Sequence, residues 1–207
     1  MAGHLKIVAQ LHHLVSAQIV STLSIQNATT ADVKKAIAEV QGDLSMSVGG
    51  PDATNVPYCQ KFMSNGIQTV AVAYAVLYGG DGIPDTDAYL EFYDNRNGAW
   101  QLVTEAPTKS DFERRKLYVS SIKSGMPNET WFVVWGDWIA SGNGLKIRLY
   151  SYNGDTVRTL WGRDDLSYGR IKVEPDSITL DYDRAYNSPD PDNRVHEVLH
   201  VTPNGFE

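Results

Sequence analysis

The stretch that decides the fold is Ala88–Thr104, which reads AYLEFYDNRNGAWQLVT. Two runs rich in aromatic and β-branched residues, 88–93 and 99–104, lie on either side of Asn97-Gly98. Because Asn-Gly supplies the two positive φ angles of a type I′ turn, these runs are predicted to pair as an antiparallel hairpin. The same dipeptide recurs between other β-type runs, at 65–66, 143–144, 153–154 and 204–205. Five such turns predict a meander of antiparallel strands.

Working outward from this hairpin, the rest of the chain after residue 57 also has strand character. The further predicted strands are 68–78, 117–122, 131–135, 145–152, 156–161, 170–173, 177–182 and 195–202. We therefore predict a mainly β domain over 58–207, built from antiparallel, sandwich-like sheets. The alternative is a set of propeller-blade-like repeats, since Asp81 and Asp137, and likewise Gly98 and Gly154, are 56 residues apart.

Residues 1–57 have a different character and are predicted to form one or two helices followed by a linker. Thr29 or Thr30 suits the N-cap of a helix that ends at Gly42. An earlier helix is predicted within 5–20, where these residues recur at helical spacing: Leu5, Val8, Leu11, His12 and Val15. The alternative for the first 25 residues is a signal peptide with its cleavage site at 15–17, which favours an extracytoplasmic location.

The charge of the chain argues against nucleic acid as a partner. The formal net charge is −7, and the densest basic run, 114–116, stands beside Asp111 and Glu113. A nucleic-acid binder needs a basic surface that displaces counterions from phosphates. We therefore predict a solvated face at 114–116, and a small molecule, a glycan or a protein as the partner. No run of the sequence has the apolar length of a membrane span. The oligomeric state stays open.

The single cysteine and the pair of adjacent histidines near the N-terminus are not predicted to be functional residues. The single cysteine, Cys59, excludes an intrachain disulfide and is interpreted as a small buried apolar residue. The pair His12-His13 is interpreted as a surface or tag-like pair, with metal binding as the alternative.

The segment 196–200, HEVLH, has the H-E-x-x-H pattern and resembles the zincin metallopeptidase motif. In that family the motif lies on a helix, where the i, i+4 spacing turns both histidines toward one zinc ion. Here the valines at 195, 198 and 201 favour a strand. On a strand His196 and His200 share one face and Glu197 lies on the other, which separates the base from the metal. We therefore predict a strand over 195–202.

The loop 79–87 is a candidate calcium site. Asp81, Asp85 and Asp87 offer the oxygen ligands that calcium prefers, and Gly82 permits a tight turn. The segment 81–85, DGIPD, resembles the calcium loop of thrombospondin type 3 repeats, without the further upstream Asp residues and the following Cys of those repeats. The alternative is a polar hairpin loop whose Gly, Pro and Asp serve turn geometry. The prediction is that the protein has no cofactor, with calcium at this loop as the alternative.

Three tryptophans fall within 131–138. Trp131 and Trp135 are predicted to lie in a strand, with Trp135 largely buried. Gly136-Asp137 breaks that strand, so Trp138 is predicted on an exposed loop. A loop aromatic beside Asp137 and Asn143 combines an apolar platform with directional hydrogen bonds. Trp138, Asp137 and Asn143 are therefore the predicted ligand-binding residues.

The sequence contains no G-x-S-x-G, P-loop or G-x-G-x-x-G motif in a suitable context. We therefore predict a non-enzymatic binding or interaction module, with a carbohydrate or a peptide as the ligand. The alternative is a hydrolase. It would use paired carboxylates, either Asp164-Asp165 or Asp181 with Asp183, or a metal site of His196, Glu197 and His200.

Overall fold

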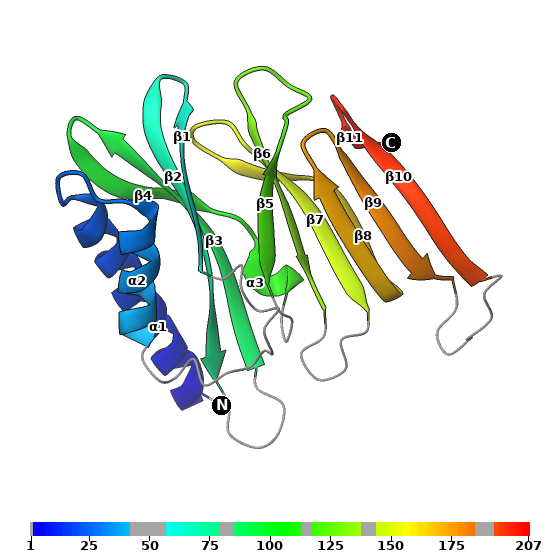
Figure 1. Ribbon diagram of the computed structural model, residues 1–207. Coiled ribbons are helices and arrows are strands. Elements are labelled where there is room, and N and C mark those ends of the chain that lie inside the picture. The colour runs from blue at the N-terminus through cyan, green and yellow to red at the C-terminus, as the bar shows by residue number, and fades with distance from the viewer. Residues whose placement is uncertain (1, 42–56, 79–84, 113–116, 138–143, 185–192) are drawn as a thin grey trace. The chain divides into compact units, whose positions relative to one another are not determined.

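The computed structural model describes residues 2–41, 57–78, 85–112, 117–137, 144–184 and 193–207. The chain divides into two compact units, 1–114 and 115–207, and each contains one antiparallel sheet (Figure 1). The predicted boundary after residue 57 falls inside the first unit. The mainly β, antiparallel fold with two N-terminal helices is confirmed.

Two helices begin the first unit, α1 (Ala2–Leu23) and α2 (Thr30–Gln41), as the sequence predicts. Thr29 is the N-cap of α2. Its Oγ1 accepts a hydrogen bond from the Asp32 backbone N–H at 3.2 Å, and the Asp32 carboxylate accepts one from the Thr29 backbone N–H at 2.7 Å. This reciprocal arrangement is a capping box, which satisfies two otherwise unpaired donors and fixes where α2 begins.

The first sheet is a four-stranded meander in the order β1-β2-β3-β4. Its strands are β1 (Tyr58–Ser64), β2 (Ile67–Tyr78), β3 (Asp85–Arg96) and β4 (Ala99–Glu105). Asn65-Gly66 joins β1 to β2, and Asn97-Gly98 joins β3 to β4. All four turn residues have φ between 50° and 81°, as the predicted type I′ turns require. The sequence prediction did not include β1 as a separate strand.

Helices α1 and α2 cover one face of the first sheet (Figure 1). The core between them includes Val15 and Ile19 of α1, Val33 and Ile37 of α2, and Val70 of β2, all fully buried. Cys59 belongs to the same core, as predicted, and burial raises the pKa of its thiol to about 11. A short helix, α3 (Thr108–Asp111), follows β4 and is tied to β3 by a hydrogen bond from Thr108 Oγ1 to the carbonyl of Ala88 at 2.8 Å.

The second unit contains a seven-stranded sheet in the order β11-β10-β9-β8-β7-β6-β5, so every neighbouring pair of strands is also consecutive in the chain. This simple meander does not support the propeller alternative. The strands are β5 (Tyr118–Ile122), β6 (Thr130–Gly136), β7 (Leu145–Tyr152), β8 (Val157–Glu174), β9 (Ser177–Asp183), β10 (Arg194–Thr202) and β11 (Gly205–Phe206).

Strand β8 differs from the prediction, because 156–161 and 170–173 belong to one 18-residue strand. Its first half pairs with β7 and its second half with β9. The intervening residues contain Asp165 and Tyr168, whose φ angles of 50° and 49° mark an irregular backbone. The strand continues through them because Leu166 pairs with Leu145 and Asp164 accepts a hydrogen bond from Arg148 of β7 at 2.8 Å.

Candidate functional site

Glu91 of β3 is a fully buried carboxyl group between the first sheet and α1. Its Oε1 accepts hydrogen bonds from Ser16 Oγ at 3.1 Å and from the Tyr74 hydroxyl at 3.2 Å. Its Oε2 accepts one from the Tyr93 hydroxyl. Burial, reinforced by the charge of Glu91, raises the pKa of both tyrosine hydroxyls above the ordinary value of 10. The hydroxyls are therefore protonated donors at neutral pH. Glu91 is therefore held rigidly by its surroundings.

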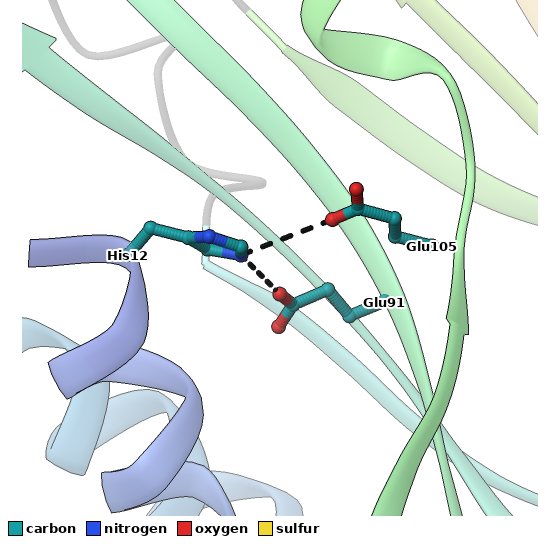
Figure 2. A group of neighbouring side chains, drawn as sticks. All are labelled: His12, Glu91 and Glu105. Atoms are coloured by element: carbon teal, nitrogen blue, oxygen red, sulfur yellow. Dashed lines mark hydrogen bonds and ion pairs between the residues drawn. The ribbon is translucent and has the colours of Figure 1, made fainter. Parts of the chain in front are cut away.

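His12 of α1 reaches the same carboxyl group (Figure 2). Its Nε2 lies 2.6 Å from Glu91 Oε1, and its ring stacks on Tyr89 with 4.1 Å between centroids. The hydrogen bond to Glu91 raises the pKa of His12 above its ordinary value, although desolvation opposes the shift. The prediction of an exposed His12-His13 pair is right for His13 and wrong for His12, whose side chain is 25% exposed.

Glu105 of β4 completes a cluster of three groups that can bind a metal. Its Oε2 lies 3.9 Å from His12 Nε2, and its side chain is 57% exposed. One ligand atom from each of His12, Glu91 and Glu105 lies within 4.8 Å of the other two. The cluster therefore joins a buried carboxyl group, a partly buried imidazole and a solvent-facing carboxyl group.

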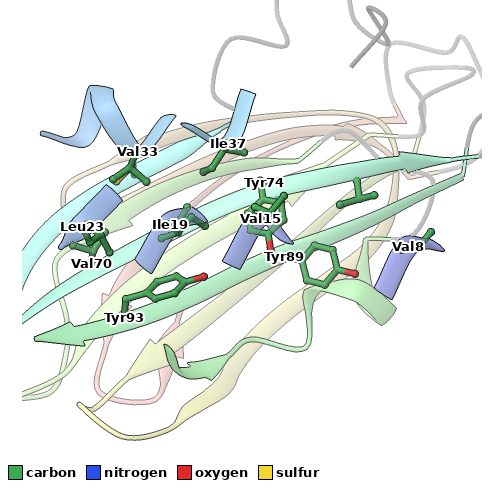
Figure 3. Close-up of a cluster of buried hydrophobic side chains, with 13 residues drawn as sticks. Val8, Val15, Ile19, Leu23, Val33, Ile37, Val70, Tyr74, Tyr89 and Tyr93 are labelled. Carbon is green, nitrogen blue, oxygen red and sulfur yellow. The ribbon is translucent and has the colours of Figure 1, made fainter. Parts of the chain in front are cut away.

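Beneath the cluster, three tyrosines of the first sheet face α1. Figure 3 shows Tyr74, Tyr89 and Tyr93 among the apolar residues of the core, opposite Val15 and Ile19. This placement follows from the alternation of side chains along a strand, because Tyr89, Glu91 and Tyr93 occupy every second position of β3.

A pocket of about 420 Å³ lies at the Glu105 side of this cluster. On its wall, the buried Asp87 carboxylate is 2.6 Å from Lys109 Nζ, and the Tyr89 hydroxyl donates to Asp87 at 3.4 Å. The residues that line the pocket are Asp87, Tyr89, Glu105, Ala106, Pro107, Lys109 and Ser110. The pocket thus presents two carboxylates, an ammonium group and two hydroxyl groups beside the apolar surface of Ala106 and Pro107.

The predicted calcium ligands are described in part. Asp81 lies outside the described residues, and Asp85 begins β3. Asp87 faces the pocket and pairs with Lys109. Calcium binding at this loop stays a prediction.

The predicted ligand-binding residues at the end of β6 are also described in part. Trp138 and Asn143 lie outside the described residues, whereas Asp137 directly follows β6. Trp131 is fully buried, and Trp135 is partly buried and stacks on Tyr118 with 5.7 Å between ring centroids. The ligand role of this loop stays a prediction.

Residues 195–202 belong to strand β10, so the predicted strand is confirmed and the H-E-x-x-H residues do not share a helix face. His196 pairs with Asp181 at 2.8 Å on the exposed face, and Glu197 accepts a hydrogen bond from the Tyr182 hydroxyl at 2.8 Å. Three of the four candidate paired carboxylates contact basic side chains, and Asp181 is the one already described beside His196. Asp164 contacts Arg148, and Asp183 contacts Arg194, at 2.8 and 2.9 Å.

In the second unit, Glu129 lies directly before β6 and accepts hydrogen bonds from three side chains. The donors are Trp131 Nε1 at 2.9 Å, Ser151 Oγ at 2.5 Å and Arg158 at 2.7 Å. Desolvation raises the pKa of Glu129, but these hydrogen bonds and the Arg158 charge outweigh it, so the net pKa lies below the ordinary 4.5.

This lowered pKa predicts how the stability depends on pH. A carboxyl group with a lowered folded-state pKa stabilises the protein fully above its unfolded-state pKa, and this stabilisation is lost as the pH falls through the folded-state value. We expect the difference in free energy of unfolding between wild type and Glu129→Gln to be constant from pH 7 to about 5.5 and to shrink below about 4.5. Urea unfolding of both proteins at several pH values measures this difference in free energy of unfolding. A difference independent of pH down to 3 would contradict the assignment.

The sequence reasoning missed Glu91 and Glu105 and gave His12 a metal-binding role only as the alternative. A signal for Glu91 was present, because it is a single charge between Leu90 and Phe92 in a run that is otherwise apolar. A charge buried within a strand requires partners. The partners could not be identified, since His12 lies 79 residues away along the chain.

Comparisons with models of protein families, with curated proteins and with solved structures find no significant match. No helix among the described residues combines the length and the apolar character that crossing a membrane requires.

Proposed function

We propose that this protein is a non-enzymatic binding module that takes a small, donor-rich polar molecule into the pocket beside Glu105. The observation that carries the proposal is the chemistry of the pocket wall, where two carboxylates lie at a cavity of about 420 Å³. Cavities of roughly 300–1,000 Å³ are typical of sites for small molecules. The ligand class is a molecule with several hydroxyl or ammonium groups, such as a monosaccharide or a small amine.

The charge of the lining supports this ligand class. Asp87 is already paired with Lys109, so Glu105, at 57% exposure, is the carboxylate most accessible to a ligand. The lining contains two acidic groups and one basic group, which disfavours an anion. Ala106 and Pro107 supply the apolar surface against which a sugar ring or an alkyl chain can pack.

The proposal predicts binding that depends on Glu105. The probes are glucose, galactose, mannose and ethanolamine, with succinate as an acceptor-only counterpart, and saturation-transfer NMR detects the bound ligand. A hydrogen bond to a charged group contributes about 1.5–3 kcal/mol. Glu105→Gln is therefore expected to weaken binding of the responding probe by about 10- to 100-fold. Ser110→Trp, which fills the pocket from an exposed position, is expected to abolish it.

The matched control is Glu39→Gln, which removes an equally exposed carboxylate from α2 (62% exposed) and is expected to leave the affinity unchanged. Binding of succinate in preference to the other probes would contradict the proposed ligand class. Failure of every probe to bind, or equal binding by Ser110→Trp, would contradict the pocket as the site.

A further inference from the structure

We propose that His12, Glu91 and Glu105 form a binding site for a divalent transition-metal ion. The inference goes beyond the proposed function, because the cluster shares only Glu105 with the pocket lining and the inference holds whether or not an organic molecule binds in the pocket. It rests on the spacing of the ligand atoms, on the support that the surroundings give to Glu91, and on the solvent exposure of Glu105.

Two of the three distances between ligand atoms are within about 0.7 Å of the spacing that a metal ion needs, and the third, between Glu91 and Glu105, is at most 4.8 Å. Zinc–nitrogen and zinc–oxygen bonds of about 2.0–2.2 Å place neighbouring ligand atoms about 3.3 Å apart in a tetrahedral site. The His12 Nε2 atom lies 2.6 Å from Glu91 Oε1 and 3.9 Å from Glu105 Oε2. The first distance must lengthen and the second must shorten, each by about 0.6–0.7 Å, to reach this spacing. Glu105 is exposed enough to make its part of the adjustment by side-chain rotation.

The surroundings hold two of the ligands in place. Ser16, Tyr74 and Tyr93 donate hydrogen bonds to Glu91, and stacking on Tyr89 fixes the plane of the His12 ring. Outer hydrogen bonds of this kind orient the ligands of metal sites in proteins. The lone pair of Nε2 would bind the ion, and the proton that Nε2 shares with Glu91 would leave to solvent.

The chemistry of the ligands selects the class of metal. One imidazole nitrogen with two carboxylate oxygens suits zinc, iron(II), cobalt(II) or manganese(II), whereas calcium and magnesium favour oxygen ligands throughout. Three protein ligands leave positions for water, and the 57% exposure of Glu105 places them toward solvent.

Cobalt(II) alone is the probe, because its visible absorption reports coordination by protein ligands directly. Tag-free, full-length protein is treated with EDTA, dialysed and titrated with cobalt(II) in the absence of any organic ligand. We expect one ion per chain, displaced by zinc, as the affinity order of divalent metals requires. His12→Gln and Glu105→Gln are each expected to weaken binding by at least about tenfold, the loss caused by removing even an outer partner of a metal ligand.

The controls separate this site from other histidines and from the pocket. His13→Gln and the double variant His196→Gln/His200→Gln are expected to bind cobalt as wild type does. Glu105→Gln keeps the fold testable, because this side chain is 57% exposed. The Ser110→Trp variant is expected to lose binding of the organic probe and to keep binding of the metal.

Absence of a cobalt spectrum in wild type, or a spectrum that survives His12→Gln, would overturn the inference and leave the pocket proposal intact.

Discussion

Replacing Glu91 with alanine is expected to lower the free energy of unfolding by about 3–5 kcal/mol, the usual cost of breaking a buried ion pair. The cost is high because the substitution removes one acceptor group and leaves four donors unsatisfied at once, two of them buried, on Tyr74 and Tyr93, and two partly buried, on His12 and Ser16. These donors belong to α1, β2 and β3, so Glu91 fastens the first helix to the sheet.

Urea unfolding followed by circular dichroism measures the effect, and peptide-resolved hydrogen exchange shows where it falls. Exchange is expected to increase over Ala2–Leu23 and not in residues 117–137. The matched control is Glu105→Ala, which removes a neighbouring but exposed carboxyl group and is expected to cost less than about 0.5 kcal/mol. If Glu91→Ala and Glu105→Ala had equal effects, Glu91 would not be the fastening point of the helix.

Replacing Trp131 with alanine is expected to destabilise the second unit by about 3–5 kcal/mol, because it leaves a large cavity in the core. Trp131 is fully buried on β6, the strand next to edge strand β5 of the seven-stranded sheet, and its indole N–H donates a hydrogen bond to Glu129. Trp135→Ala is expected to cost less, since Trp135 is only partly buried and packs at the side of the same core.

The two tryptophan variants form a matched pair, as each removes one indole from strand β6. Urea unfolding compares them directly. Trp131→Phe separates the two contributions, because it keeps most of the buried volume and removes the hydrogen bond to Glu129. Equal destabilisation by Trp131→Ala and Trp135→Ala would contradict the placement of the core around Trp131.

The sequence by itself determined the class of fold and the local structure at several points. Asn97-Gly98 predicted the hairpin of β3 and β4, and Asn65-Gly66 predicted the turn before β2, because few other residue pairs adopt two successive positive φ angles. Thr29 or Thr30 was predicted as the N-cap of α2, and the valines around 195–201 predicted a strand where the H-E-x-x-H pattern alone would have indicated a helix. In each case the signal lies within a few neighbouring residues.

Tertiary contacts determined the course of strand β8 and the composition of the candidate site, which local sequence signals did not predict. Strand β8 runs through a turn-like segment because Arg148 and Leu145 of β7 hold Asp164 and Leu166 in the ladder. The cluster of His12, Glu91 and Glu105 exists because α1 packs on the first sheet, against β2 and β4, which brings together residues up to 93 positions apart in sequence. Side-chain periodicity shows which face of an element a residue occupies, but it does not show which other element covers that face. The only sequence signal for the candidate site was therefore one charged residue, Glu91, in an otherwise apolar run. The partners of Glu91 depend on how the helix packs on the sheet.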